Sequence, residues 1–132
     1  MAVGPTKEVS TVDWKLFQEH AQRKMGAHFQ VALHERNPVG FPKRFDLVSP
    51  AEDIVGDAKY LTLVRGVKLP PAKFMEIAGH VWLLEKVPAK RRFLVFGNQR
   101  QVAEWWLEKY GTLVTTVEFY FLAEDDTLDR LR

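Results

Sequence analysis

The sequence predicts one α/β domain in which helices pack against a mixed β-sheet, and three observations lead to this class. Its 132 residues fit a single domain, and 46% hydrophobic residues are enough for a sizeable core. Segments with helical periodicity alternate with segments of strand character. In the second half a strand, a helix and another strand follow one another, which implies a parallel pair joined by a right-handed crossover. The predicted order is α-β-β-β-α-β-α-β.

The first half of the chain is expected to hold one helix and three strands. Ser10 or Thr11 can cap a helix that runs to about His28, because apolar residues recur at helical spacing between Trp14 and Met25. Three strand-like segments follow, separated by turn-forming residues: HFQVALHE (28–35), KRFDLVS (43–49) and IVGDAKYLTLV (54–64).

The second half is expected to alternate helices and strands. A helix over 69–88 starts with prolines, which suit the first helical turn, and it ends at Pro88. The remaining segments are a continuous apolar strand, a helix closed by Gly111 and a last strand: RRFLVFG (91–97), NQRQVAEWWLEKYG (98–111) and TTVEFYFL (115–122).

Composition excludes several classes of protein. The chain has no cysteine, so it has no disulfides or thiolate zinc sites, and a cytoplasmic location is expected. The segment MAVGPTKEVS lacks the apolar region of a signal peptide, and no run approaches the ~20 apolar residues of a membrane span, so no membrane partner is expected. Residues 61–110 hold nine Lys or Arg against four Asp or Glu. Such a basic stretch can meet phosphates, although a solvated surface is the simpler interpretation.

An acid and a base stand inside the apolar segment IVGDAKYLTLV. Asp57 and Lys59 share a face, because successive side chains of a strand point to opposite faces. In KRFDLVS, Phe45 and Leu47 are expected on one face and Asp46 on the other. If the two strands form a hairpin, one allowed register pairs these residues: Val48 with Val55, Leu47 with Gly56, and Asp46 with Asp57.

Two opposed carboxylates, with Cβ atoms ~5 Å apart, destabilise a strand pair unless a positive charge lies between them. Lys59 offers partial neutralisation. A divalent cation does better, because Mg²⁺ is commonly held by one or two carboxylates with water and substrate phosphate. Gly56 leaves room for close approach. Taken alone, the Asp57–Lys59 pair is more often an incidental ion pair. The apolar flanks, the partner acid Asp46 and the element order favour a site.

With these residues the sequence resembles the PD-(D/E)XK nuclease superfamily, also called restriction-endonuclease-like. That family carries an acid on one strand of a hairpin and a (D/E)-x-K on the next, preceded by a helix and followed by a helix–strand unit. Here RFDLVS supplies Asp46, with Phe45 where the family name has Pro, and GDAK supplies Asp57 and Lys59. The resemblance covers residues 11 to about 122. The expected organisation is a flexible leader (1–10), a nuclease-like domain (11–122) and an acidic C-terminal tail (123–132).

The resemblance implies a role for each residue of the motif. Asp46 and Asp57 would hold Mg²⁺, with Mn²⁺ as the alternative ion, and the backbone carbonyl of Ala58 would assist. Lys59 would orient or activate the attacking water and offset the charge that develops on the phosphoryl group. The chemistry implied is metal-assisted phosphodiester hydrolysis.

Accessory residues and nucleic-acid contacts are also expected. Many members of the family add an acid from the first helix. Glu19 is the available acid, but at ~100° per residue it lies nearly opposite the apolar stripe, whereas Gln18 lies nearer to that stripe. Glu35 and His80 are further accessory candidates, with a solvated or packed side chain as the competing interpretation. The basic residues that could touch phosphates are Lys43, Arg44, Lys90, Arg91 and Arg92.

The expected function is a small Mg²⁺-dependent endonuclease that acts on DNA, with RNA as the other substrate considered. Cutting both strands with one active site per chain favours a homodimer. Two alternatives stay open: a catalytically inactive nuclease-like module that binds nucleic acid or a protein, and an ordinary α/β interaction domain with a strand ion pair. The structure distinguishes the nuclease from these alternatives, because a nuclease requires Asp46 and Asp57 to converge near Lys59. An Asp46 that points away from Asp57 excludes the nuclease interpretation.

Overall fold

The protein is a layered α/β domain, seen in a computed structural model that describes residues 11–62 and 71–132. In this part of the chain the helices are α1 (Thr11–Phe29), α2 (Pro71–Lys86), α3 (Arg100–Tyr110) and the short 3-10 turn η1 (Gly111–Leu113). The strands are β1 (His34–Arg36), β2 (Phe45–Val48), β3 (Ile54–Leu61), β4 (Arg91–Asn98), β5 (Glu118–Leu122) and β6 (Leu128–Arg130).

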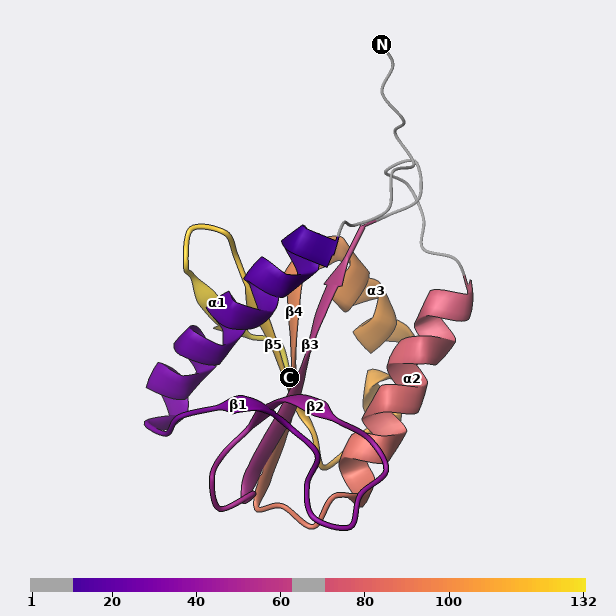
Figure 1. Ribbon diagram of the computed structural model, residues 1–132. Coiled ribbons are helices and arrows are strands. Elements are labelled where there is room, and N and C mark those ends of the chain that lie inside the picture. The colour runs from indigo at the N-terminus through magenta and orange to yellow at the C-terminus, as the bar shows by residue number, and fades with distance from the viewer. Residues whose placement is uncertain (1–10, 63–70) are drawn as a thin grey trace.

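The strands form one mixed sheet in which they lie in sequence order from β1 to β6. The first three strands are antiparallel neighbours, β3, β4 and β5 run parallel, and β6 is antiparallel to β5. Each parallel connection contains a helix, α2 and then α3, as crossovers require. Figure 1 shows the sheet between α1 on one side and α2 and α3 on the other. The predicted class, a mixed sheet flanked by helices, is confirmed.

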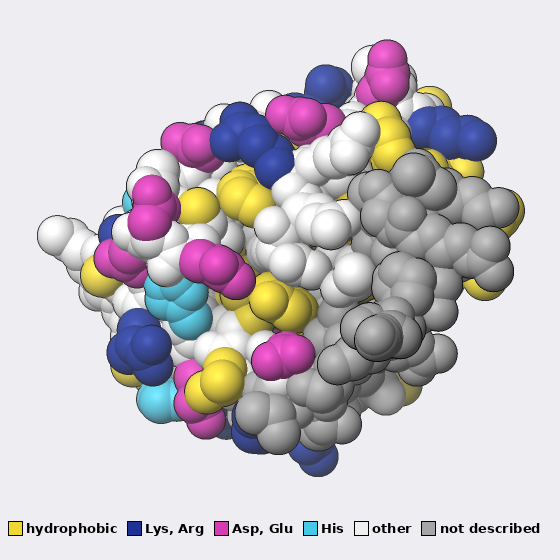
Figure 2. Space-filling view, turned by 90° about the horizontal axis from the view of Figure 1, so that it is seen from above, with side chains coloured by type: hydrophobic (Ala, Val, Ile, Leu, Met, Phe, Trp, Pro, Cys, Tyr) yellow, Lys and Arg dark blue, Asp and Glu magenta, His cyan; other side chains and the backbone are white. Residues whose placement is uncertain are grey.

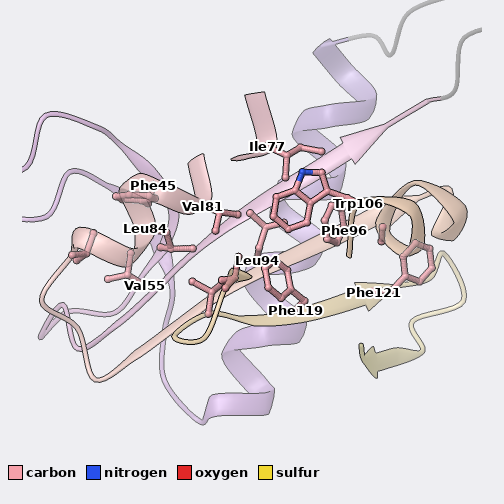
Figure 3. Close-up of a cluster of buried hydrophobic side chains, with 14 of the residues drawn as sticks. Phe45, Val55, Ile77, Val81, Leu84, Leu94, Phe96, Trp106, Phe119 and Phe121 are labelled. Carbon is pink, nitrogen blue, oxygen red and sulfur yellow. The ribbon is translucent and has the colours of Figure 1, made fainter. Parts of the chain in front are cut away.

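One apolar core lies between the sheet and the helices α2 and α3. Trp106 of α3, Phe96 of β4 and Phe119 of β5 are buried there together with Ile77 of α2 (Figure 3). The ring of Trp106 lies 5.7 Å from that of Phe119, and its Nε1 donates a hydrogen bond to the carbonyl of Phe74 at 3.1 Å. This bond satisfies the indole while it ties α3 to α2.

The second core lies beneath α1. The predicted apolar stripe of this helix is buried at its centre, where Phe17, Ala21 and Met25 face the sheet. At its ends the stripe is less buried, because Trp14 is half-buried and His28 is exposed. The sheet residues in this core include Leu47, Ala58, Phe93, Val95, Tyr120 and Leu122. Continuous apolar β4 therefore serves both cores, as expected of a strand covered on both faces.

Two glycines let aromatic rings of the α1 side lie against the sheet. Gly56 pairs with Phe93, and a Cβ added at Gly56 would lie 2.3 Å from Cζ of that ring. A Cβ added at Gly97 would lie 2.2 Å from Cε1 of Phe17. The close approach expected at Gly56 is thus made by an aromatic ring of the α1 core.

The first strand begins later than predicted. The segment 28–35 was expected to be a strand, but α1 continues to Phe29 and β1 starts only at His34. Gln30 has the left-handed φ of 58°, and its N–H donates to the carbonyl of Ala27 while Val31 donates to that of Gly26. These bonds form the helix-ending Schellman motif, which usually employs glycine and here lacks that signal in the sequence.

The β2–β3 hairpin has the predicted register, since Leu47 pairs with Gly56 and Val48 with Val55. One expectation for β2 was wrong. Phe45 and Leu47 do not share a face: Phe45 belongs to the α2 core and Leu47 to the α1 core. Phe45 is the first residue of the strand, and its ring packs against Phe41 in the preceding loop at 5.8 Å.

The chain after residue 122 contributes a strand that its sequence pattern did not predict. In β6, Leu128 pairs with Leu122 and Arg130 with Tyr120. The segment is only three residues long and has no apolar alternation by which to find it. The expected leader (1–10) and the end of the predicted third strand (63–64) lie outside the described residues.

None of the described helices is long and apolar enough to cross a membrane.

The packing at Gly56 gives a first prediction. Gly56→Ala places a methyl group inside the buried ring of Phe93, so we expect a loss of about 1–3 kcal/mol in the free energy of unfolding, measured by urea denaturation. The matched control is Gly79→Ala on α2, where an added Cβ meets nothing within 4 Å. There we expect a gain of about 0.5–1 kcal/mol from helix propensity. Equal effects at the two sites would contradict the steric explanation.

Candidate active site

Asp46 and Asp57 converge across the β2–β3 hairpin. Asp46 precedes Leu47 on β2 and Asp57 follows Gly56 on β3, so the two acids lie next to the Leu47–Gly56 pair. The backbone N–H of Asp46 donates to Oδ1 of Asp57 at 3.2 Å. Both side chains are buried, with exposed fractions of 7% and 2%. The two carboxyl groups also interact electrostatically, since burial and the charge of Asp57 together raise the pKa of Asp46. Residues from neighbouring strands thus form one buried acidic pair, as the sequence predicted.

Asp46 is held in place from two directions. The backbone N–H of Ala58 on β3 donates to its Oδ2 at 3.0 Å, and Nε2 of Gln18 on α1 lies 3.4 Å from its Oδ1. Gln22, one turn further along α1, donates to the backbone carbonyl of Asp46 at 3.0 Å. Helix α1 therefore positions both the side chain and the backbone of this residue.

Asp57 is surrounded by nitrogen atoms at its other oxygen, Oδ2. Lys43 Nζ lies 3.1 Å from Oδ2, His80 Nδ1 lies 3.6 Å from it and Lys59 Nζ lies 3.9 Å from it. Lys59 Nζ also contacts His80 Nδ1. Lys59 is itself buried, with an exposed fraction of 8%. The predicted pair of Asp57 and Lys59 is thus part of a larger charged cluster, which α2 joins through His80.

The acidic pair shares a proton. Burial and the neighbouring charge of Asp57 raise the pKa of Asp46 from its ordinary 3.8 to about 8. Burial by itself would also raise the pKa of Asp57, but the hydrogen bond from Asp46 and the charges of Lys59 and Lys43 outweigh it and lower that pKa. At neutral pH Asp46 is therefore protonated, while Asp57 carries the negative charge.

The two basic partners on β3 and α2 are shifted in the same direction. Burial lowers the pKa of Lys59, against the opposing effect of Asp57. Burial and the charge of Lys59 lower the pKa of His80 to about 4. His80 is therefore neutral at physiological pH and can accept a hydrogen bond from Lys59 through Nδ1. This contact fixes where the Lys59 amine points.

Gln18 carries an unsatisfied oxygen at the site. Its side chain is 2% exposed, and among the described residues its Oε1 is a buried polar atom without a hydrogen-bond partner. An unpaired buried oxygen is costly, so this atom would be stabilised by a water or an ion bound beside it. Glu19, by contrast, is exposed. Helical geometry thus brings the amide, not the acid, to the carboxylates.

The remaining predicted residues divide between the site and the far end of the sheet. Glu35 forms a 3.6 Å ion pair with the exposed Arg44. Lys90, Arg91 and Arg92 lie where β4 begins, and Arg91 and Arg92 pair with the first two residues of β3. Lys59 stands five residues further along β3, roughly 16 Å at 3.3 Å per residue. Of the five predicted nucleic-acid contacts, Lys43 and Arg44 are the ones near the site.

The donor set fits a hard divalent cation. In the part of the chain that the structure describes, no three His, Cys, Asp or Glu side chains gather as a metal cluster. The oxygen atoms present are instead the carboxylates of Asp46 and Asp57 and the unpaired Oε1 of Gln18. Mg²⁺ and Mn²⁺ accept such oxygen ligands and retain several waters, so two carboxylates are sufficient.

Sequence reasoning missed two residues that shape this site. Lys43 was expected to touch phosphates, yet it forms the shortest ion pair to Asp57. Gln22 had no assigned role, although it bonds to the backbone of Asp46. Its position one helical turn after Gln18 was the available signal, because residues four apart share a helix face.

Comparison with models of known protein families gave no match, and no curated protein matches the sequence significantly.

The raised pKa of Asp46 predicts how stability depends on pH. In the folded chain Asp46 keeps its proton up to about pH 8, whereas in the unfolded chain it loses it near pH 3.8. The contribution of Asp46 to the free energy of unfolding is therefore fully present below about pH 4 and is lost as the pH rises to 8. We expect the stability of the wild type, relative to Asp46→Asn, to fall by several kcal/mol over this range, because one pKa unit corresponds to about 1.4 kcal/mol.

The measurement is urea unfolding in EDTA at several pH values between 4 and 8. Asp125→Asn is the control, because the hydrogen bond with Thr127 lowers the pKa of this exposed residue, which then titrates below the window. A constant difference between wild type and Asp46→Asn across the range would contradict a protonated Asp46.

Proposed function

We propose that the protein is a Mg²⁺-dependent nuclease that hydrolyses phosphodiester bonds in DNA. One observation carries the proposal: Asp46 and Asp57 converge, and Lys59 lies on the same strand within 3.9 Å of Asp57. A surface ion pair would leave these groups solvated, whereas all three are buried. The resemblance to the PD-(D/E)XK nucleases, with its hairpin and following helix–strand unit, supports the same chemistry.

The chain would bind the cation through oxygen atoms from three elements. Asp46 on β2 and Asp57 on β3 would be the ligands, and the carbonyl of Ala58 and Oε1 of Gln18 would be the further oxygen donors. When bound, the ion polarises the phosphate and lowers the pKa of a coordinated water. Because Asp57 is buried, its negative charge acts in a medium of low polarity, where it attracts a cation more strongly than in water.

Lys59 would handle the attacking water. Its pKa is lowered by burial, so its amine can exchange a proton closer to neutral pH than an exposed lysine can. The contact with His80 Nδ1 holds Nζ beside Asp57, from which it would act on a water activated by an ion that the carboxylates hold. In this proposal His80 is a positioning residue, because it acts through Lys59.

The face seen in Figure 2 favours local rather than long-range attraction of nucleic acid. In Figure 2 acidic and basic side chains are interspersed over the described part of the face, and no large field of one sign gathers there. Arg44 is exposed near the site and paired with Glu35. We therefore expect phosphate contacts close to the carboxylates. Because such contacts would be few, the affinity for nucleic acid should depend only moderately on salt concentration.

Cleavage of plasmid DNA and of labelled DNA and RNA oligonucleotides tests the proposal. We expect cleavage with Mg²⁺ or Mn²⁺ and none with EDTA. Asp57→Asn and Lys59→Met should each lower the rate by roughly 100-fold or more, about 2.7 kcal/mol of transition-state stabilisation. These variants preserve shape while they remove the charge.

The matched controls are Asp125→Asn and Lys109→Met, two exposed residues away from the site. Their cleavage rates should equal that of the wild type. Activity that survives Asp57→Asn or Lys59→Met would point to a contaminant or another site. Binding of nucleic acid without cleavage, under every metal condition, would favour the inactive module.

Gln18 gives a separate prediction about the cation. Gln18→Met keeps the size of the side chain but removes Oε1, so we expect Mn²⁺ affinity, measured by isothermal titration calorimetry, to fall by about tenfold. The neighbouring Glu19→Gln is the control: it removes a full negative charge from an exposed position and should leave the affinity unchanged. A larger loss of Mn²⁺ affinity for Glu19→Gln than for Gln18→Met would show that Glu19, and not Gln18, supports the metal.

A further inference from the structure

We propose that Lys43 is a built-in counter-ion: its ammonium occupies the cation position at Asp57 in the metal-free chain, and a divalent ion must displace it to bind. The inference rests on the proposed function, because it concerns the same carboxylates. It assigns to Lys43 the control of metal affinity, a role different from the phosphate contact that its sequence suggests.

The ammonium of Lys43 lies in a site made for a cation. Its Nζ is 3.1 Å from Oδ2 of Asp57 and 2.8 Å from the carbonyl of Arg44, and it lies 4.4 Å from the centre of the Phe45 ring. The side chain is 18% exposed. A carboxylate, a carbonyl and an aromatic face are the groups that a partly desolvated ammonium requires.

The same oxygen is the one that a metal needs. Oδ1 of Asp57 accepts from the backbone of Asp46, and Oδ2 of Asp46 accepts from the backbone of Ala58. The outward oxygen of Asp57 is therefore Oδ2, which Lys43 contacts more closely than Lys59 does. A divalent ion bound at Oδ2 of Asp57 would repel an ammonium that lies 3.1 Å from the same oxygen. The ion and Lys43 therefore compete for this oxygen.

The side chain of Lys43 is less confined than that of Lys59, since 18% of it is exposed against 10%. Lys43 precedes β2, which begins at Phe45, so its backbone lies in a loop. Lys59 lies within β3, where the backbone is paired with β4 along its whole length. Displacement of Lys43 by rotation of its side chain would leave the hairpin and both carboxylates in place.

The first test compares wild type, Lys43→Met and Lys90→Met. Lys90 is an exposed lysine at the opposite end of the sheet and serves as the matched control. In Mn²⁺ titrations by calorimetry we expect Lys43→Met to bind about tenfold more tightly or better, because the competing charge is gone. In EDTA the same variant should be less stable to urea, because Asp57 has lost its closest counter-charge. Lys90→Met should match the wild type in both.

A purely structural role for Lys43 would lower stability without tightening metal binding, and this outcome overturns the inference. So does weaker Mn²⁺ binding by Lys43→Met, which would make Lys43 an aid to the metal. If the wild type binds no Mn²⁺ at all, the proposed function fails and the inference fails with it. If the wild type binds Mn²⁺ and Lys43→Met binds it with the same affinity, the inference about Lys43 is wrong while the proposed function stands.

A second measurement on the unmutated chain covers the case in which Lys43→Met does not fold. Lysines are acetylated with and without saturating Mn²⁺, and each site is quantified by mass spectrometry. Displacement should raise the rate at Lys43 by about threefold or more, because a released amine is more accessible and no longer ion-paired. The rate at Lys90 should not change. An unchanged or slower rate at Lys43 contradicts displacement.

Discussion

The structure around the site depends on one unfavourable contact, the opposition of Asp46 and Asp57 across the β2–β3 hairpin. Two buried carboxylates cannot both be ionised at this distance without compensation. The chain compensates by a proton on Asp46, by the ammonium groups of Lys43 and Lys59 beside Asp57, and by the backbone N–H of Ala58. Each neighbouring polar group therefore has its position set by the need to balance this pair.

The scaffold delivers these groups from both faces of the sheet. Helix α1 contributes Gln18 from one side, and α2 contributes His80 from the other. Such placement requires each helix to lie close to the sheet. On the α1 side Gly97 leaves space for the ring of Phe17, and Gly56 leaves space for that of Phe93. Core packing and site geometry are thus coupled: a shift of α1 would move Gln18 away from Asp46.

Much of this arrangement could be predicted from the sequence, because it follows from periodicity. The hairpin register, the shared face of Asp57 and Lys59, and the preference for Gln18 over Glu19 all follow from strand and helix repeats. The start of β1 could not be predicted, since a non-glycine residue, Gln30, takes the left-handed position that ends α1. The position of Lys43 could not be predicted either, because it lies in a loop whose path depends on tertiary contacts.

The energetics of the cluster argue that it exists for a purpose other than stability. Replacing a buried ion pair by apolar residues of similar volume is often neutral or stabilising, so a domain that only had to fold would gain nothing from Asp46, Asp57 and Lys59 in its interior. The unpaired Oε1 of Gln18 adds a further cost at the same place. A bound cation would remove both costs together, since it would neutralise the carboxylates and accept the amide oxygen as a ligand. The groups that make the metal-free chain less stable are therefore the ones that would bind the metal.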